Sequence, residues 1–366
     1  MRLKTSLLPL LMLAAAMPAS GAPARERVEV AFALDTTGSM ADLIDGAKRK
    51  IWSIASSVVD ANPDADIAMA LVAYRDRGDE YVVQTTPLSE DIQGLYGKLI
   101  RLEADGGGDT PESVNEALDK TVSGLQWTSG DHVKRIIFLV GDAPPHMDYA
   151  QERQYPAILK IASERKITVN AVQAGDMAET IPVWKEIAQY GHGRYIAIPQ
   201  SGGEIVIIVT PYDNEILRLQ RSLDDTVLPY GGLDKRAETR TKMEEKAAAP
   251  SSVQLDNSEY YSKRASKKEV ITGGGDLIAD VANKAVDLDA VKDKELPDIL
   301  QGKTKAEVQA LIGEKLSARR KLEAEMAGLI AKRDAFTAAE REKAAKTDSR
   351  DSFDSVVEDT LREQLR

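Results

Sequence analysis

The stretch Val28–Met40, VEVAFALDTTGSM, joins a predicted buried strand to a predicted helix through a short polar loop. Its apolar run ends at Asp35, and an amphipathic helical pattern begins at Ala41. The loop carries a carboxylate and two hydroxyl groups at alternate positions, Asp35, Thr37 and Ser39, whose oxygens can converge beyond the carboxyl end of the strand. Because ligands bind there in open α/β sheets, the stretch predicts both a fold class and the place of a site.

Strand and helix patterns alternate over about 170 residues of the chain. Strand-like runs at 28–34, 67–74, 134–140, 168–174 and 194–198, with a short edge strand at 81–84, are separated by helical patterns at 41–59, 90–102, 111–125, 151–165 and 179–190. This alternation predicts an α/β fold with a doubly wound, mostly parallel sheet that helices cover on both faces.

Two further acidic loops follow predicted strands or precede predicted helices. GGGDTPE at 106–112 contains Asp109, Thr110 and Glu112, and Asp142 ends the most apolar strand. The carboxyl ends of parallel strands share one edge of a sheet, so we expect these groups to face the same crevice as Asp35. Crowded carboxylates repel one another, and a divalent cation removes that cost. Carboxylate and hydroxyl oxygens favour Mg²⁺, with Mn²⁺ or Ca²⁺ as alternatives.

Helix capping is the simpler interpretation of the first loop by itself. A hydroxyl of Thr37 or Ser39 would accept hydrogen bonds from free backbone amides at the start of the next helix. Capping does not explain Glu112 or Asp142, however, so the three loops together favour a metal site.

The three motifs, in this order, resemble a von Willebrand factor A domain with a metal-ion-dependent adhesion site. The resemblance spans roughly residues 26 to 200. It implies a Rossmann-like fold, one Mg²⁺ on the top edge of the sheet, and binding of a protein partner that presents an Asp or Glu. The segment after this domain, including LDDTVLPYG, is similar to that of a group of exported bacterial proteins.

The resemblance also implies roles for individual residues. Asp35, Thr37 and Ser39 match the first loop of the adhesion site, and Asp142 matches the last. In the middle loop the ligand is Thr110 by comparison with integrin α-type domains. It is Glu112 by comparison with integrin β-type domains, which the order DTPES and the later GDAPPH resemble more closely.

A neighbouring metal position is implied by the same comparison. Asp76, Asp109 and Glu112 match acidic positions of a second site in the integrin β-type domains. The chain contains three histidines, His132, His146 and His192, none in a metal-binding motif, and each is expected to be a surface or capping residue. His146 follows Asp142 closely enough to line the first site.

The N-terminus has the features of an export signal. Two basic residues precede an apolar run at 7–17, which is too short for a membrane span of roughly 20 residues, and small residues follow it. We therefore expect a signal peptide at 1–22, no membrane span after its cleavage, and a periplasmic or secreted protein. The chain has no cysteine, which excludes disulfides and thiolate metal sites, and its net charge of −11 argues against nucleic acid as a partner.

The second half of the chain is richer in charged residues and has mainly helical patterns. We divide the chain into the signal peptide at 1–22, an A domain at 26–210, a helix and charged, partly helical, solvated linker at 211–270, and a helical C-terminal region at 271–366. An apolar stripe runs along 303–346 among many charged residues, and it must be buried. It packs either on the preceding helices or in an intermolecular coiled coil that would give self-association.

Three functions are compatible with these patterns. The first is an exported, non-enzymatic protein that binds an acidic residue of a partner through Mg²⁺. The second is a metal-dependent hydrolase with His146 or Asp109 as its base. The third is an A-domain subunit of an AAA-type ATPase, against which the export signal argues.

Overall fold

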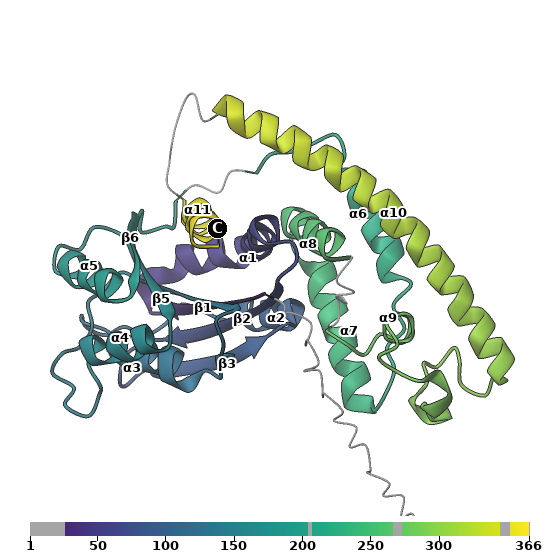
Figure 1. The fold of residues 1–366 in the computed structure, drawn as a ribbon, viewed down its shortest axis with the longest axis horizontal. Coiled ribbons are helices and arrows are strands. Elements are labelled where there is room, and N and C mark those ends of the chain that lie inside the picture. Colours follow the sequence, from purple (N-terminus) through teal and green to yellow (C-terminus); the bar gives the residue numbers. More distant parts are fainter. Residues whose placement is uncertain (1–25, 204–206, 266–272, 345–351, 366) are drawn as a thin grey trace, which may run out of the picture.

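The computed structural model describes residues 26–203, 207–265, 273–344 and 352–365 (Figure 1). The predicted signal peptide at 1–22 lies outside these residues. Within the described ranges, every helix is either too short or too polar to cross a membrane.

A six-stranded sheet forms the centre of the first half of the chain. Its order is β3-β2-β1-β4-β5-β6, and only the edge strand β3 is antiparallel to its neighbour. The strands are β1 (Arg27–Asp35), β2 (Asp66–Tyr74), β3 (Val83–Ser89), β4 (Val133–Gly141), β5 (Ile167–Ala174) and β6 (His192–Ile198). The predicted mostly parallel sheet is therefore confirmed.

The strand order reverses at β1. The chain moves from β1 outward to β2 and β3 and then returns to β4 on the other side of β1, where Leu34 pairs with Val140. Ligands bind at such a switch point because the loops after the two central strands leave in opposite directions and open a crevice. Asp35 and Asp142 lie in these two loops.

Helices cover both faces of the sheet. One face packs on α1 (Ala41–Ala61), α2 (Ile92–Leu99) and two later helices, and its core includes the stacked rings of Phe32 and Phe138, 5.5 Å apart. The other face packs on α3 (Val114–Asp119), α4 (Tyr155–Glu164) and α5 (Thr180–Tyr190). Each fully buried Leu, Ile, Val or Phe side chain stabilises the fold by about 1.5–3 kcal/mol.

The helix predicted at 111–125 begins later than expected. The α3 helix starts at Val114 and continues into a π-helical turn, η2 (Lys120–Gly124). The residues before it cannot be helical because Glu112 pairs with the loop after β4, through a bond from its amide to the Pro144 carbonyl.

The second half of the described chain is mainly helical, as predicted. It contains α6 (Asp213–Asp224), α7 (Leu233–Ala248), α8 (Ser251–Arg264), α9 (Leu277–Ala282) and α10 (Lys305–Ala344), with short 3-10 turns η4 (Leu288–Ala290) and η5 (Asp293–Glu295) before α10. In Figure 1, α10 arches over α6 and the neighbouring helices.

The described part of the predicted solvated linker, residues 231–265, is instead largely packed. Its helix α8 buries Val253 and Tyr260 in the same core as α1, and the Tyr260 ring lies 5.6 Å from the Trp52 ring. These two residues lie seven positions apart and so share one helix face, which a composition-based interpretation misses.

The apolar stripe of α10 is buried within the chain. Met326 and Ile330 pack against Ile216 and Leu219 of α6, while Val308 and Ile312, nearer the start of the helix, belong to a cluster with α9. Of the two predicted alternatives, the structure favours packing on the preceding helices.

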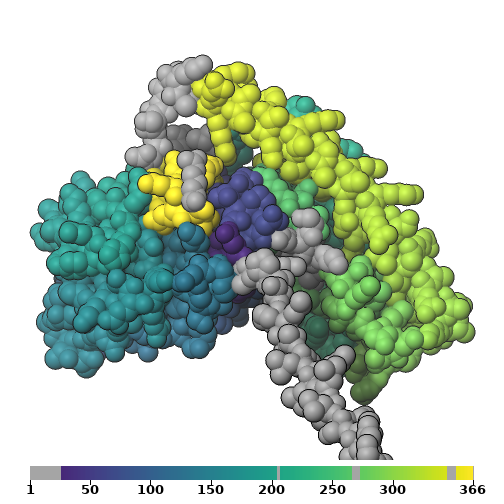
Figure 2. Space-filling model, in the orientation of Figure 1, coloured from purple at the N-terminus to yellow at the C-terminus, as the bar shows by residue number. Residues whose placement is uncertain are grey.

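The last described helix, α11 (Phe353–Gln364), returns to the first half of the molecule. It lies against α1 and β6 (Figure 2), and Phe353, Val357 and Leu361 are buried in the core of that face. The Phe353 amide donates a 2.8 Å hydrogen bond to the carbonyl of Gly202, just after β6. The covering of this face is therefore completed by residues far from it in sequence.

Candidate metal centre

The first loop of the candidate site follows β1. Asp35 is fully buried, and its Oδ1 accepts hydrogen bonds from the Thr37 amide at 2.9 Å and the Thr37 hydroxyl at 2.7 Å. Its Oδ2 is also buried but has no hydrogen-bond partner within the described ranges. The Ser39 hydroxyl lies 3.4 Å from that of Thr37, and Ser39 is exposed at the mouth of the site. The three predicted oxygens thus converge, with one carboxylate oxygen left unsatisfied.

The middle loop separates the two competing residues. Glu112 is buried, and its Oε2 lacks a hydrogen-bond partner among the residues that the structure describes, whereas Thr110 is exposed. A Cβ atom at Gly107 would lie 2.9 Å from Thr37 Cβ and 3.2 Å from Glu112 Oε1, so the Glu112 carboxylate is turned toward the first loop. The geometry therefore favours Glu112 over Thr110 as the contribution of this loop.

The third loop brings in Asp142 together with a residue that sequence inspection missed. Asp142 is 7% exposed, and its Oδ2 accepts a 2.8 Å hydrogen bond from the side-chain amide of Gln200. The same amide donates to the Ser39 carbonyl at 3.2 Å. Gln200, after β6, therefore connects the first and third loops.

The carboxylates interact strongly with one another. Burial, together with the charges of Asp142 and Asp79, raises the pKa of Asp35 to about 7. Burial, together with the charges of the neighbouring carboxylates, Asp35 and Asp76 foremost, raises the pKa of Glu112 to about 9. Buried acidic groups with unsatisfied oxygens, accompanied by two hydroxyls, form a donor set that suits a hard divalent cation such as Mg²⁺. These residues fit the ion that the sequence predicts.

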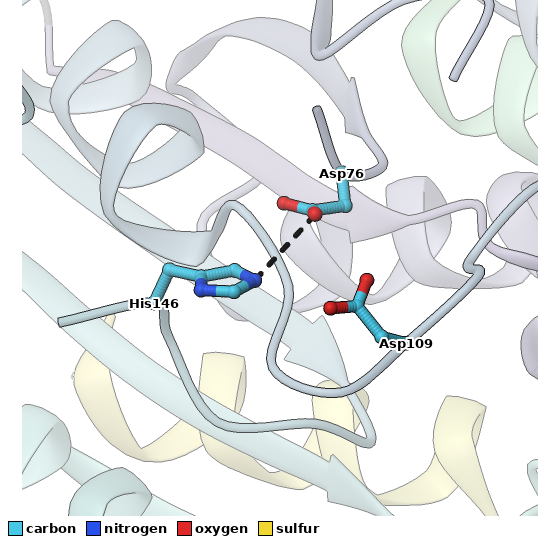
Figure 3. Close-up of side chains that lie close together, drawn as sticks. All are labelled: Asp76, Asp109 and His146. Carbon is cyan, nitrogen blue, oxygen red and sulfur yellow. Dashed lines mark ion pairs between the residues drawn. The ribbon is translucent and has the colours of Figure 1, made fainter. Parts of the chain in front are cut away.

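A second cluster lies beside the first, at the end of β2 (Figure 3). Asp76, Asp109 and His146 each offer one ligand-type atom, and these atoms lie within 4.8 Å of one another. Two of the three were predicted for a neighbouring site, but the predicted third member was Glu112. His146, expected to be a surface or capping residue, is only 6% exposed, because its ring stacks on Tyr149 at 3.9 Å.

Asp79 is a further residue that the sequence did not single out. Its carboxylate accepts a 3.1 Å hydrogen bond from the Gly107 amide, and its charge raises the pKa values of Asp35 and Glu112. Its place in the loop after β2, at the same edge of the sheet, is the one signal that could have indicated it.

Comparison with known proteins agrees with this architecture. Residues 29–210 match the family model of the von Willebrand factor A domain. Over 121 residues the chain is 29% identical to an ariadne-like RING finger protein of Acanthamoeba polyphaga mimivirus. The aligned region covers 32% of this chain and 11% of the viral protein. That similarity therefore concerns a small part of the viral protein.

Three solved structures each match 48% of the chain. They are the SpRpn10 von Willebrand factor A domain (12% identity, TM-score 0.36, 89% of that chain), proximal thread matrix protein 1 of the mussel byssus (12%, 0.34, 42%) and the pilus adhesin SpaC of Lactobacillus rhamnosus GG (14%, 0.37, 29%).

Proposed function

We propose that the von Willebrand factor A domain at residues 29–210 binds a protein partner through a divalent cation, which an acidic side chain of the partner completes. The ion is Mg²⁺, or Mn²⁺ or Ca²⁺, and the partner presents an Asp or a Glu. The observation that carries the proposal is a pair of buried carboxylate oxygens at the carboxyl edge of the sheet. Asp35 Oδ2 and Glu112 Oε2 find no hydrogen-bond partner in the part of the chain that the structure describes.

The residues of the site have two roles, neutralising the cation and leaving one side of it open to the partner. Asp35, Glu112 and Asp142 would neutralise the cation, directly or through water, while Thr37 and Ser39 contribute neutral oxygens. When bound, the ion supplies a positive centre for an incoming carboxylate. Ser39, the exposed member of the set, marks the side from which that carboxylate approaches.

The rest of the proposal concerns the whole protein. The chain acts as a non-enzymatic adhesion or scaffold protein, exported to the periplasm or the medium by the segment at 1–22. The helical region from α6 to α10 supports the A domain and offers a further surface for a partner.

Affinity capture from the envelope of the producing cell tests the proposal. The bait is the full chain, compared with Asp35→Ala and with Asp45→Ala, which removes an exposed carboxylate of α1 as a control. We expect a partner retained by the wild type and Asp45→Ala in Mg²⁺ and lost by both in EDTA. Retention of the same partner by Asp35→Ala in EDTA would refute metal-dependent binding.

A further inference from the structure

We propose that Asp76, Asp109 and His146 form a second metal site, which takes a transition-metal dication such as Zn²⁺. This site is separate from the Mg²⁺-type site at Asp35 and does not depend on the proposed partner binding. His146 is the residue that distinguishes it, because the sequence resemblance implied an all-oxygen neighbouring site that used Glu112.

The environment of His146 leaves one ring nitrogen available. Its Nδ1 lies 2.8 Å from Oδ1 of Asp148, and a carboxylate can only accept, so Nδ1 carries the proton. In the neutral ring, Nε2 is then the unprotonated nitrogen. That atom is buried, has no hydrogen-bond partner among the described residues, and points toward Asp76 and Asp109 (Figure 3). Metal-binding histidines are held in this way, with the other ring nitrogen donating to a carboxylate.

A simple ion pair explains the arrangement less well. If His146 were doubly protonated, its Nε2 would face Asp76 Oδ2 across 3.5 Å, which is longer than a good charged hydrogen bond. A buried imidazolium would keep one N–H without a satisfactory acceptor. A metal ion between the two groups uses the Nε2 lone pair instead.

Asp76 is held in place from two sides. The Ser113 hydroxyl donates to its Oδ1 at 2.8 Å, and the Tyr149 hydroxyl donates to its Oδ2 at 2.9 Å. Because Tyr149 also stacks on the His146 ring, one side chain positions both buried groups. Each carboxylate oxygen of Asp76 retains a second lone pair for a cation.

Asp109 forms the exposed side of the cluster. Ligands held at about 2.0–2.2 Å from a zinc ion lie at most about 4.4 Å apart, and the three ligand-type atoms here lie within 4.8 Å of one another. A small movement of the exposed Asp109 side chain therefore closes the set. The remaining positions around the ion face solvent.

The ligand types select the class of ion. An imidazole nitrogen favours Zn²⁺ and other first-row transition metals over Mg²⁺ and Ca²⁺, which prefer oxygen. Two carboxylates balance the charge of a dication. The chain would thus hold chemically different ions at two adjacent sites, a Mg²⁺-type ion at Asp35 and a transition-metal ion at His146.

Calorimetric titration with Zn²⁺, in buffer saturated with Mg²⁺, tests this site. We expect one Zn²⁺ per wild-type chain, at least about a hundredfold weaker binding by His146→Ala, and about tenfold weaker binding by Asp148→Asn, the effect typical of a lost orienting partner. His132→Ala, which removes an exposed histidine, is the matched control and should bind as the wild type does. Asp35→Asn should lose Mg²⁺ and retain Zn²⁺.

Nitrogen NMR gives a readout that does not depend on the stability of a variant. Because the chain has only three histidines, the His146 ring can be assigned in ¹⁵N-histidine-labelled protein. We expect an unprotonated Nε2 that shifts on addition of Zn²⁺. Unchanged Zn²⁺ binding by His146→Ala, or a protonated Nε2 that Zn²⁺ does not affect, would overturn the second site.

Discussion

The amide of Glu112 donates a 3.0 Å hydrogen bond to the carbonyl of Pro144, and thereby joins the middle loop of the candidate site to the loop after β4. The His146 amide returns a 3.0 Å bond to the Glu112 carbonyl. This two-way pairing fixes the Glu112 backbone, so that its side chain faces Asp35 while that of Thr110 remains in solvent. The choice between Thr110 and Glu112, which the sequence left open with the closer resemblance on the side of Glu112, is thus made by a contact between distant residues.

Substitution of these two residues should therefore have unequal effects. Glu112→Gln removes a charge from the ion-binding set and should weaken Mg²⁺ binding by about tenfold or more, whereas Thr110→Val should change it less than about twofold. Isothermal titration of metal-free protein with Mg²⁺ measures both. A larger loss in Thr110→Val than in Glu112→Gln would assign the position to Thr110 instead.

Gln200 should support the site without contacting the ion. Its amide holds Asp142 and the Ser39 carbonyl, so Gln200→Leu should free both loops and lower Mg²⁺ affinity by about tenfold. Gln189→Leu, which changes an exposed glutamine of α5, is the control. Equal affinities for the two variants would show that Gln200 has no positioning role.

The C-terminal helix should contribute to the stability of the A domain. Leu361 is fully buried in the core beside α1, so Leu361→Ala should lower the free energy of unfolding by about 2–5 kcal/mol in urea denaturation. Asp359→Ala removes only an exposed ion pair with Arg362 and should change it by less than about 0.5 kcal/mol. If Leu361→Ala were as stable as Asp359→Ala, α11 would not be an integral part of this core.

The stability of the metal-free protein should depend on pH through Asp35. Its pKa rises on folding from 3.8 to about 7, so its contribution to stability is fully present below about pH 4 and is lost as pH rises through 7. Asp35→Asn cannot titrate. In EDTA, the stability of the wild type relative to this variant should therefore fall by roughly 2–3 kcal/mol between pH 5 and pH 8.

Denaturation at the two pH values measures this difference, and Mg²⁺ should reverse it. At pH 8 the ion stabilises the charged wild-type site but has little to bind in Asp35→Asn, so the wild type alone should gain stability. A parallel pH dependence of the two proteins in EDTA would show that Asp35 is already ionised in the folded state.

The sequence predicted what depends on local patterns. Alternating strand and helix patterns gave the parallel sheet, and the loops after strands gave Asp35, Glu112 and Asp142 as residues of one edge. The packing of α8 and α11 on α1 was not predictable, because it joins segments about 200 or more residues apart whose few apolar residues specify no particular partner. The partnership of Gln200 with Asp142 was missed for the same reason.

The burial of His146 illustrates a different limit. Its separation from Asp142 in sequence suggested only that it lines the first site. The backbone pairing with Glu112 turns the GDAPPH loop so that the ring points instead toward Asp76, at the end of another strand. The direction in which a loop side chain points is set by tertiary contacts and not by its spacing in the sequence.

Titration of the metal-free full chain with Mg²⁺ at pH 8 tests the central claim most directly. We predict that the wild-type chain binds one Mg²⁺. Asp35→Asn should bind none at this site, and Asp45→Asn should bind Mg²⁺ as the wild type does. Absence of Mg²⁺, Mn²⁺ and Ca²⁺ binding by folded wild-type protein, or equal binding by Asp35→Asn, would contradict a cation site at Asp35.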